Sequence, residues 1–298
     1  MRDTPVFPAV HRLCYGLRDG TSGRRHALQV RLDGGGGEDG RMTSSPTLAL
    51  PGGTIPMLGL GTWQSTGDEA VRAVSGALEL GYRHLDTATG YGNEGQVGRA
   101  LSLVDIDRDD VFLTTKLPPE HAGRERRTIL ESLAALGTDH VDLWLIHWPP
   151  GGKAAPEVWQ ELRRARDEGL TRSIGVSNYS IPQIDQLIEA TGEAPAVNQI
   201  PYSPADHDPE LLDAHRERGI AVEGYSPLKR TDLASEAITK AAAVHDATPA
   251  QVVLAWHLAH DVVVIPKTTH LARLEENLAA LDLQLTAEEV AAIDALGW

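Results

Sequence analysis

Three titratable residues stand where short apolar segments of the sequence end. Asp86, Lys116 and His147 each close a run rich in apolar or β-branched residues. If these runs are parallel strands of one barrel, their C-terminal ends meet at a single mouth. A carboxylate, an ammonium and an imidazole in one half-buried cleft can orient one another and move protons. The sequence therefore predicts an acid–base site at this mouth, with Tyr91 projecting over it from the loop after Asp86.

Polar residues also end the other predicted strands. Ser177 and Asn178 follow one strand, Gln199 ends the next, and Tyr225 and Lys267 end the last two. Each alone has an ordinary structural explanation, because polar residues after strands often cap helices or extend into solvent. Their repeated placement at one end of successive strands favours a shared functional cleft.

The segments that must position these residues alternate between strands and helices. The predicted strands are eight short segments, at 58–62, 84–86, 111–117, 141–147, 173–178, 196–199, 221–225 and 262–267. Residues with helical spacing lie between them; Gly81 and Gly137 end two of these helices, and Asp208 and Thr248 each precede a proline that begins one. Eight such units predict an α/β fold, a single (β/α)₈ TIM barrel.

A doubly wound nucleotide-binding sheet is the competing architecture. It requires a Gly-x-Gly-x-x-Gly turn after its first strand. The nearest segment, Gly59-Leu-Gly61-Thr-Trp63-Gln64, lacks the third glycine and carries an indole where the backbone has to approach a pyrophosphate. The sequence also lacks a Gly-x-x-x-x-Gly-Lys-Ser/Thr phosphate-binding loop. The barrel is therefore the favoured architecture.

Two segments of different character precede the barrel repeat. The pattern around the turn Pro51-Gly52-Gly53, at 47–57, predicts an N-terminal β-hairpin. Residues 1–41 include four consecutive glycines and show neither a helical nor a strand period, so we expect a disordered extension. The predicted organisation is thus an extension at 1–41 and one barrel domain at 42–298.

Composition excludes several classes of function. The net charge of −15 repels nucleic acid and anionic lipid surfaces, and no apolar run is long enough to cross a bilayer. Cys14 is the only cysteine, which excludes an intrachain disulfide and predicts a cytoplasmic protein. His257 and His260 lie three apart with no third ligand beside them, so we expect no metal site. Nothing indicates an obligate partner, so we expect a monomer.

Seven spaced segments resemble, in order, the diagnostic segments of the aldo-keto reductase superfamily. They are His84-Leu-Asp-Thr-Ala88, Tyr91-Gly-Asn-Glu94, Leu145-Ile-His-Trp-Pro149, Gly175-Val-Ser-Asn178, Val197-Asn-Gln199, Gly224-Tyr-Ser-Pro-Leu228 and Ile265-Pro-Lys267. The resemblance spans roughly residues 47–296 and is closest to prokaryotic reductases of the 2,5-diketo-gluconate reductase type. Several motifs that match together are far more specific than any one of them.

The resemblance implies NADPH-dependent reduction of aldehyde or ketone carbonyls to alcohols. Tyr91 would be the general acid, Lys116 would supply the cation that a phenol with a pKa near ~10 needs, and Asp86 would orient that lysine. His147 would hydrogen-bond the substrate carbonyl. Small keto-aldehydes, keto sugars and aromatic aldehydes are the expected substrates. They would be contacted by Trp63, Tyr91, His147 and Trp148.

The same resemblance implies where NADPH binds. Tyr225 would stack on the nicotinamide, and Lys267 and Arg273 would hold the 2′-phosphate. The other cofactor contacts implied are Ser177, Asn178, Gln199, Ser226, Leu228, Thr268, Glu276 and Asn277. Two residues depart from the usual family pattern: Thr268 replaces a serine, and Lys229 replaces a glycine.

A different class of function is the alternative. Some relatives bind NADPH as catalytically weak redox sensors or scaffold subunits. The joint presence of Asp86, Tyr91, Lys116 and His147 argues for a working reductase instead.

Overall fold

An eight-stranded parallel sheet forms the centre of the computed structural model, which describes residues 30–31 and 45–297. Its strands follow chain order: β4 (Leu60–Gly61), β5 (His84–Asp86), β6 (Phe112–Leu117), β7 (Val141–Ile146), β8 (Thr171–Ser177), β9 (Val197–Pro201), β10 (Ala221–Tyr225) and β11 (Val263–Val264). Parallel bridges from Leu58 to Val264 and from Gly61 to Lys267 join the first strand to the last. These bridges close the sheet, and the predicted (β/α)₈ barrel is confirmed.

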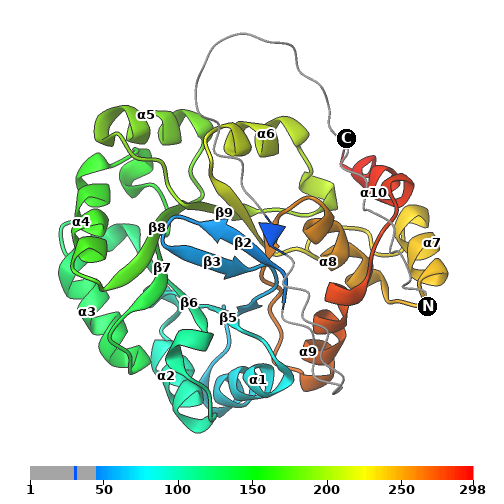
Figure 1. The fold of residues 1–298 in the computed structure, drawn as a ribbon, viewed down its shortest axis with the longest axis horizontal. Helices are drawn as coiled ribbons and strands as arrows, with labels where there is room; N and C mark the ends of the chain where they lie inside the picture. Colours follow the sequence, from blue (N-terminus) through cyan, green and yellow to red (C-terminus); the bar gives the residue numbers. More distant parts are fainter. Residues whose placement is uncertain (1–29, 32–44, 298) are drawn as a thin grey trace, which may run out of the picture.

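Helices surround the strands as an outer ring (Figure 1). They are α1 (Gly67–Leu80), α2 (Glu94–Leu103), α3 (Glu125–Leu136), α4 (Pro156–Asp167), α5 (Ile181–Thr191), α6 (Pro209–Glu217), α7 (Glu236–Val244), α8 (Pro249–Ala259), α9 (Leu271–Leu278) and α10 (Ala287–Asp294). The predicted helix ends are confirmed. Gly81 and Gly137 adopt left-handed conformations after α1 and α3, while Asp208 and Thr248 accept backbone hydrogen bonds at the starts of α6 and α8.

The predicted hairpin is formed by β2 (Thr47–Leu50) and β3 (Gly53–Pro56), and it lies across the ring of strands (Figure 1). Leu48 and Ile55 belong to a buried cluster that includes Leu143, Val197 and Val263 from the barrel strands. Leu143, Val197 and Val263 lie near the starts of their strands. The hairpin therefore plugs the N-terminal end of the barrel and leaves the opposite end for a site.

Within residues 1–41, the structure describes only β1 (Val30–Arg31), whose backbone pairs antiparallel with β2. The rest of the predicted extension lies outside the described residues, and its disorder stays a prediction. Among the residues that the structure does describe, no helix is both long and apolar enough to span a membrane.

Candidate active site

A pocket of about 430 Å³ opens at the C-terminal ends of the barrel strands. Asp86, Ser177 and Tyr225 are the last residues of β5, β8 and β10, so the barrel brings them to one mouth as the sequence predicts. The predicted site residues that line this pocket are Trp63, Asp86, Tyr91, His147, Trp148, Ser177, Asn178, Gln199, Tyr225, Ser226 and Lys267. Gly61, Gly90, Lys229 and Ile265 complete the lining.

Lys116 connects the acidic and phenolic groups beneath this pocket. Its side chain is fully buried on β6, and Nζ donates to Asp86 Oδ1 at 2.6 Å and to the Thr87 carbonyl at 2.8 Å. Nζ also lies 3.4 Å from the Tyr91 hydroxyl, and 5.0 Å from the centre of the tyrosine ring. The ammonium is therefore held between a carboxylate and a phenol.

Burial and charge act in opposite directions on these groups. Burial disfavours the charged form of Lys116, but Asp86 and Tyr91 outweigh it, and the pKa of Lys116 is raised. Burial raises the pKa of Tyr91, and Lys116 only partly offsets this. Lys116 thus lowers the pKa of Tyr91, as expected, but burial raises it by more, so the pKa stays above its ordinary value. The phenol stays protonated, as a proton donor must be, with a cation beside it to stabilise the phenolate.

His147 is neutral beside this pair. Burial and the nearby charge of Lys116 lower the pKa of His147 to about 3. Its ring meets that of Tyr91 edge to face, with centroids 5.6 Å apart. A neutral imidazole next to the phenol can donate one hydrogen bond to a carbonyl oxygen without adding charge to the pocket.

The amide-bearing side chains form a connected rim. Asn178 has a left-handed backbone, with φ of 63°, and its Nδ2 donates to the His147 carbonyl and to Ser177 Oγ. The Tyr225 hydroxyl donates to Asn178 Oδ1 at 2.8 Å, which fixes the ring at the pocket wall. Gln199 uses both hydrogens of Nε2, on Asp86 and on Glu223. Within the described part of the chain, no donor reaches Gln199 Oε1, so this atom retains its capacity to accept a hydrogen bond.

Glu223 and His84 form a second buried layer that sequence reasoning missed. His84 Nδ1 lies 3.2 Å from the Pro56 carbonyl, which can only accept, so Nδ1 carries the proton. Burial lowers the pKa of His84 to about 3, so its Nε2 is an unprotonated acceptor, and it faces Glu223 Oε1 at 3.4 Å. Burial and Asp86 raise the pKa of Glu223 to about 8. This raised pKa favours the protonated, neutral form of Glu223 at neutral pH, with Oε1 facing the acceptor nitrogen of His84. The available signal was an acidic residue inside an otherwise apolar strand.

The remaining predicted cofactor residues lie outside the pocket lining. Arg273 is exposed on α9 and forms no ion pair within the described residues, whereas Glu276 accepts a hydrogen bond from Thr248 at the start of α8. Thr268 is buried, and its hydroxyl accepts from the backbone of His270. Leu228 is half-buried and Asn277 is buried. The structure does not bring these five residues to the pocket mouth, and their cofactor contacts stay predictions.

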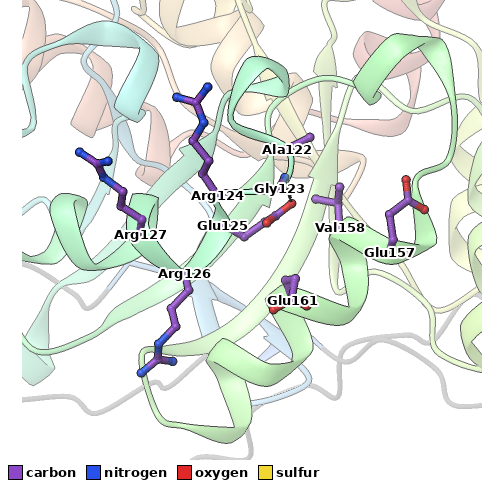
Figure 2. A pocket seen from close by; sticks show the side chains of 9 residues that line it. All are labelled: Ala122, Gly123, Arg124, Glu125, Arg126, Arg127, Glu157, Val158 and Glu161. Carbon is purple, nitrogen blue, oxygen red and sulfur yellow. Dashed lines mark hydrogen bonds between the residues drawn. The ribbon is translucent and has the colours of Figure 1, made fainter.

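A second hollow lies between the start of α3 and the first turns of α4 (Figure 2). Arg124, Arg126 and Arg127 are exposed there, and Figure 2 shows the side chain of Arg126 extending in the opposite direction to those of Arg124 and Arg127. Glu157 and Glu161 line its other side. None of the four predicted catalytic residues lines this hollow, and its charges do not converge on one point, so it is not the active site.

Comparison with known proteins agrees with this geometry. The model of the Aldo/keto reductase family matches residues 57–297. Methylglyoxal reductase DkgA of Yersinia pestis is 42% identical over 260 residues, which cover 86% of this chain and 94% of the relative. 2,5-diketo-D-gluconic acid reductase B of Corynebacterium sp. is 41% identical over 261 residues, with the same 86% and 94% covered. The crystal structure of Bombyx mori aldo-keto reductase in complex with NADP gives a TM-score of 0.80 at 34% identity, covering 86% of this chain and 94% of that one.

The chain belongs to the aldo/keto reductase family and is an oxidoreductase. The resemblance noted in the sequence, including that to 2,5-diketo-gluconate reductases, is thereby confirmed.

Proposed function

We propose that this protein reduces aldehydes and ketones to alcohols with NADPH, and that Tyr91 is the general acid. The observation that carries the proposal is the position of Lys116 Nζ, 2.6 Å from Asp86 Oδ1 and 3.4 Å from the Tyr91 hydroxyl, beneath one pocket. A buried ammonium in this place has one consequence for chemistry: it stabilises negative charge on the phenol oxygen more than it stabilises the neutral phenol.

The residues divide the work between proton delivery and substrate orientation. His147 donates a hydrogen bond to the substrate carbonyl and places its oxygen near the Tyr91 hydroxyl. Tyr91 transfers its proton to that oxygen as the carbonyl carbon is reduced, and Lys116 stabilises the phenolate that remains. Asp86 keeps the ammonium in place and balances its charge, so the buried site carries no net charge before the reaction.

The pocket chemistry fits a nicotinamide cofactor. Gln199 Oε1 is available to accept a hydrogen bond, Asn178 and Ser177 supply further polar atoms, and the Tyr225 ring is held at the wall for stacking. When bound, NADPH supplies the hydride. Lys267, at the pocket edge, and Arg273, exposed on α9, offer positive charge to the cofactor phosphates. We propose that Ser226, Leu228, Thr268, Glu276 and Asn277 complete the cofactor site. The relative from Bombyx mori, which was crystallised with NADP, supports this choice of cofactor.

Substrates enter past two exposed indoles. Trp63 and Trp148 line the pocket, and they are 52% and 49% exposed. Large aromatic faces at a half-open mouth favour aromatic aldehydes and small keto-aldehydes, while the polar floor suits keto sugars. The relatives named for methylglyoxal and 2,5-diketo-D-gluconic acid reduction support the same range. The single cysteine supports a cytoplasmic location, and we propose that the enzyme acts as a monomer.

The test is a carbonyl panel assayed with wild type, Tyr91→Phe and the control Tyr179→Phe. Tyr179 loses its hydroxyl contact with the Ala154 carbonyl, and this contact lies outside the pocket lining. We expect Tyr91→Phe to lower kcat by about 10²- to 10⁴-fold while NADPH still binds, and Tyr179→Phe to retain activity. If Tyr91→Phe kept more than about a tenth of the wild-type rate with chemistry limiting, Tyr91 would not be the acid.

The same experiment separates the reductase from an NADPH-binding sensor or scaffold. NADPH binding is followed by fluorescence while turnover is measured across the carbonyl panel. Turnover that depends on Tyr91 supports the reductase. Tight NADPH binding with no consumption of any carbonyl would instead identify a sensor or scaffold.

A further inference from the structure

Three side chains from distant segments converge at a place that the proposed reaction does not use. His207 follows the short helix η5 (Pro204–Asp206) after β9, His260 follows α8, and Asp294 is the last residue of α10. One ligand atom from each lies within 4.8 Å of those of the other two. None of the three lines the pocket that contains Tyr91 and His147.

We propose that His207, His260 and Asp294 bind one divalent transition-metal ion such as Zn²⁺. Asp294 Oδ1 is the common point of the cluster, 2.8 Å from His260 Nε2 and 3.7 Å from His207 Nε2. A tetrahedral ion with bonds of about 2.0–2.1 Å holds its ligand atoms about 3.3 Å apart, so small side-chain rotations bring these atoms to bonding positions. Two imidazole nitrogens and one carboxylate oxygen suit Zn²⁺, Co²⁺ or Ni²⁺, whereas Ca²⁺ and Mg²⁺ prefer oxygen alone.

The groups behind the ligands already hold two of them in orientation. The Tyr202 hydroxyl lies 2.7 Å from His207 Nδ1, and Trp256 Nε1 donates to Asp294 Oδ1 at 2.7 Å. The tautomer in which Nδ1–H donates to the Tyr202 oxygen leaves Nε2 unprotonated, as a ligand atom must be, and the Trp256 donor on the carboxylate fixes its rotation. Such supporting contacts are typical of metal-binding histidines and carboxylates.

The electrostatic surroundings permit a cation. The charges that act on His207 include Asp294 and Asp208 on the negative side and Arg216 on the positive side. The side chains of His207, His260 and Asp294 are 7%, 16% and 29% exposed, so an ion has a route in while most of its shell is protein. On binding, the proton between His260 Nε2 and Asp294 moves to His260 Nδ1 or leaves to solvent.

His257 is not part of this site, although it lies on α8, only three residues before His260. Its two ring nitrogens face the carbonyls of Val253 and Tyr202, at 2.7 and 3.0 Å. The two partners of His260 in the proposed site are instead His207, from the segment after β9, and Asp294, from α10. An ion there would join three segments, and we expect it to stabilise the fold without taking part in turnover.

The experiment titrates the full-length, chelator-treated protein with Co²⁺ and follows the visible d–d absorption, with Zn²⁺ competing. The variants are His207→Gln, His260→Gln and Asp294→Asn. The matched control is His245→Gln, which removes the histidine of another His–carboxylate pair, 3.0 Å from Glu289. We expect one Co²⁺ per chain, displaced by Zn²⁺, at least about tenfold weaker in each of the three variants, and unchanged in the control.

A second measurement needs no variant and covers the case in which one of them fails to fold. Substoichiometric Co²⁺ is added to the wild type, and the histidine ring signals are followed by NMR. Perturbation centred on His207 and His260 supports the site. Absence of Co²⁺ binding to wild type, wild-type affinity in all three variants, or perturbation centred on other histidines would overturn it. Binding is measured without NADPH or substrate, so the result is independent of the proposed reductase activity.

Discussion

Replacing Glu223 by Gln tests the description of the buried layer beneath the catalytic lysine. Glu223 is completely buried and accepts a hydrogen bond from Gln199 at Oε2, while its Oε1 faces His84 Nε2. A glutamine in the same position keeps the acceptor for Gln199 and presents an N–H to His84, so it imitates the protonated acid. The substitution therefore removes only the capacity to ionise.

The magnitude follows from linkage between protonation and folding. The pKa of Glu223 is raised from 4.5 in the unfolded chain to about 8 in the folded protein. The folded state thus binds this proton more tightly, so its contribution to stability is complete below the unfolded pKa and is lost as pH rises toward 8. Each pH unit in this window changes the free energy of unfolding by about 1.4 kcal/mol. The glutamine variant lacks this loss, so its stability relative to wild type increases by roughly 3 kcal/mol between about pH 5.5 and about pH 7.5.

The assay is urea unfolding of wild type and Glu223→Gln at these two pH values. Glu79→Gln is the control, because it makes the same chemical change at an exposed carboxylate on α1. Infrared spectra add a direct observation: the carbonyl band of a protonated, buried carboxylic acid is present in wild type at neutral pH and absent from Glu223→Gln. Parallel pH profiles for wild type and Glu223→Gln, together with no difference in that band, would show that Glu223 is ionised and that the argument from His84 is wrong.

Three further substitutions test the ion pair, the cofactor choice and the packing of the outer ring. Lys116→Met leaves the Asp86 carboxylate buried without its partner, and we expect urea unfolding to show a loss of about 3–5 kcal/mol. Arg273→Met is expected to weaken NADPH binding roughly 10- to 150-fold while NADH binding hardly changes; an equal loss for both would assign Arg273 a general structural role. Gly98→Ala on α2 puts a methyl group 2.5 Å from the Ala135 carbonyl of α3 and is expected to cost about 1–3 kcal/mol, whereas Gly95→Ala, which meets open space on the same helix, destabilises neither helix nor barrel.

The barrel and its mouth could be predicted from the sequence because both follow from local patterns. Apolar strands that end in Asp86, Lys116 and His147 define the mouth once the strands are parallel, and capping residues such as Thr248 mark the helix starts. The strand ends were less predictable. The segment at 58–62 forms a strand only at Leu60–Gly61, because the closing contacts with the last strand are single bridges rather than a continuous ladder.

The contacts that the sequence did not reveal join residues far apart along the chain. Glu223 matters because Gln199 and His84 converge on it, and Gln199 lies 24 and His84 139 positions earlier. The spacing of these residues does not indicate that they contact one another, since the contacts depend on how far each strand is shifted along its neighbour as the sheet closes. The same applies to the cluster of His207, His260 and Asp294 outside the barrel, because its members come together only in the folded chain.

The buried layer also explains why the ion pair of Lys116 with Asp86 is tolerated inside the barrel. A charged Glu223 next to Asp86 would place two carboxylates against one ammonium and leave a net negative charge in a region without solvent. Gln199 donates to both Asp86 and Glu223 and so links the two acids. Protonation of Glu223 then leaves one carboxylate for one ammonium. Besides Asp86, the only titratable side chain of the described residues whose oxygen contacts Lys116 Nζ is Tyr91, so negative charge that develops on the Tyr91 hydroxyl is stabilised by the same ammonium.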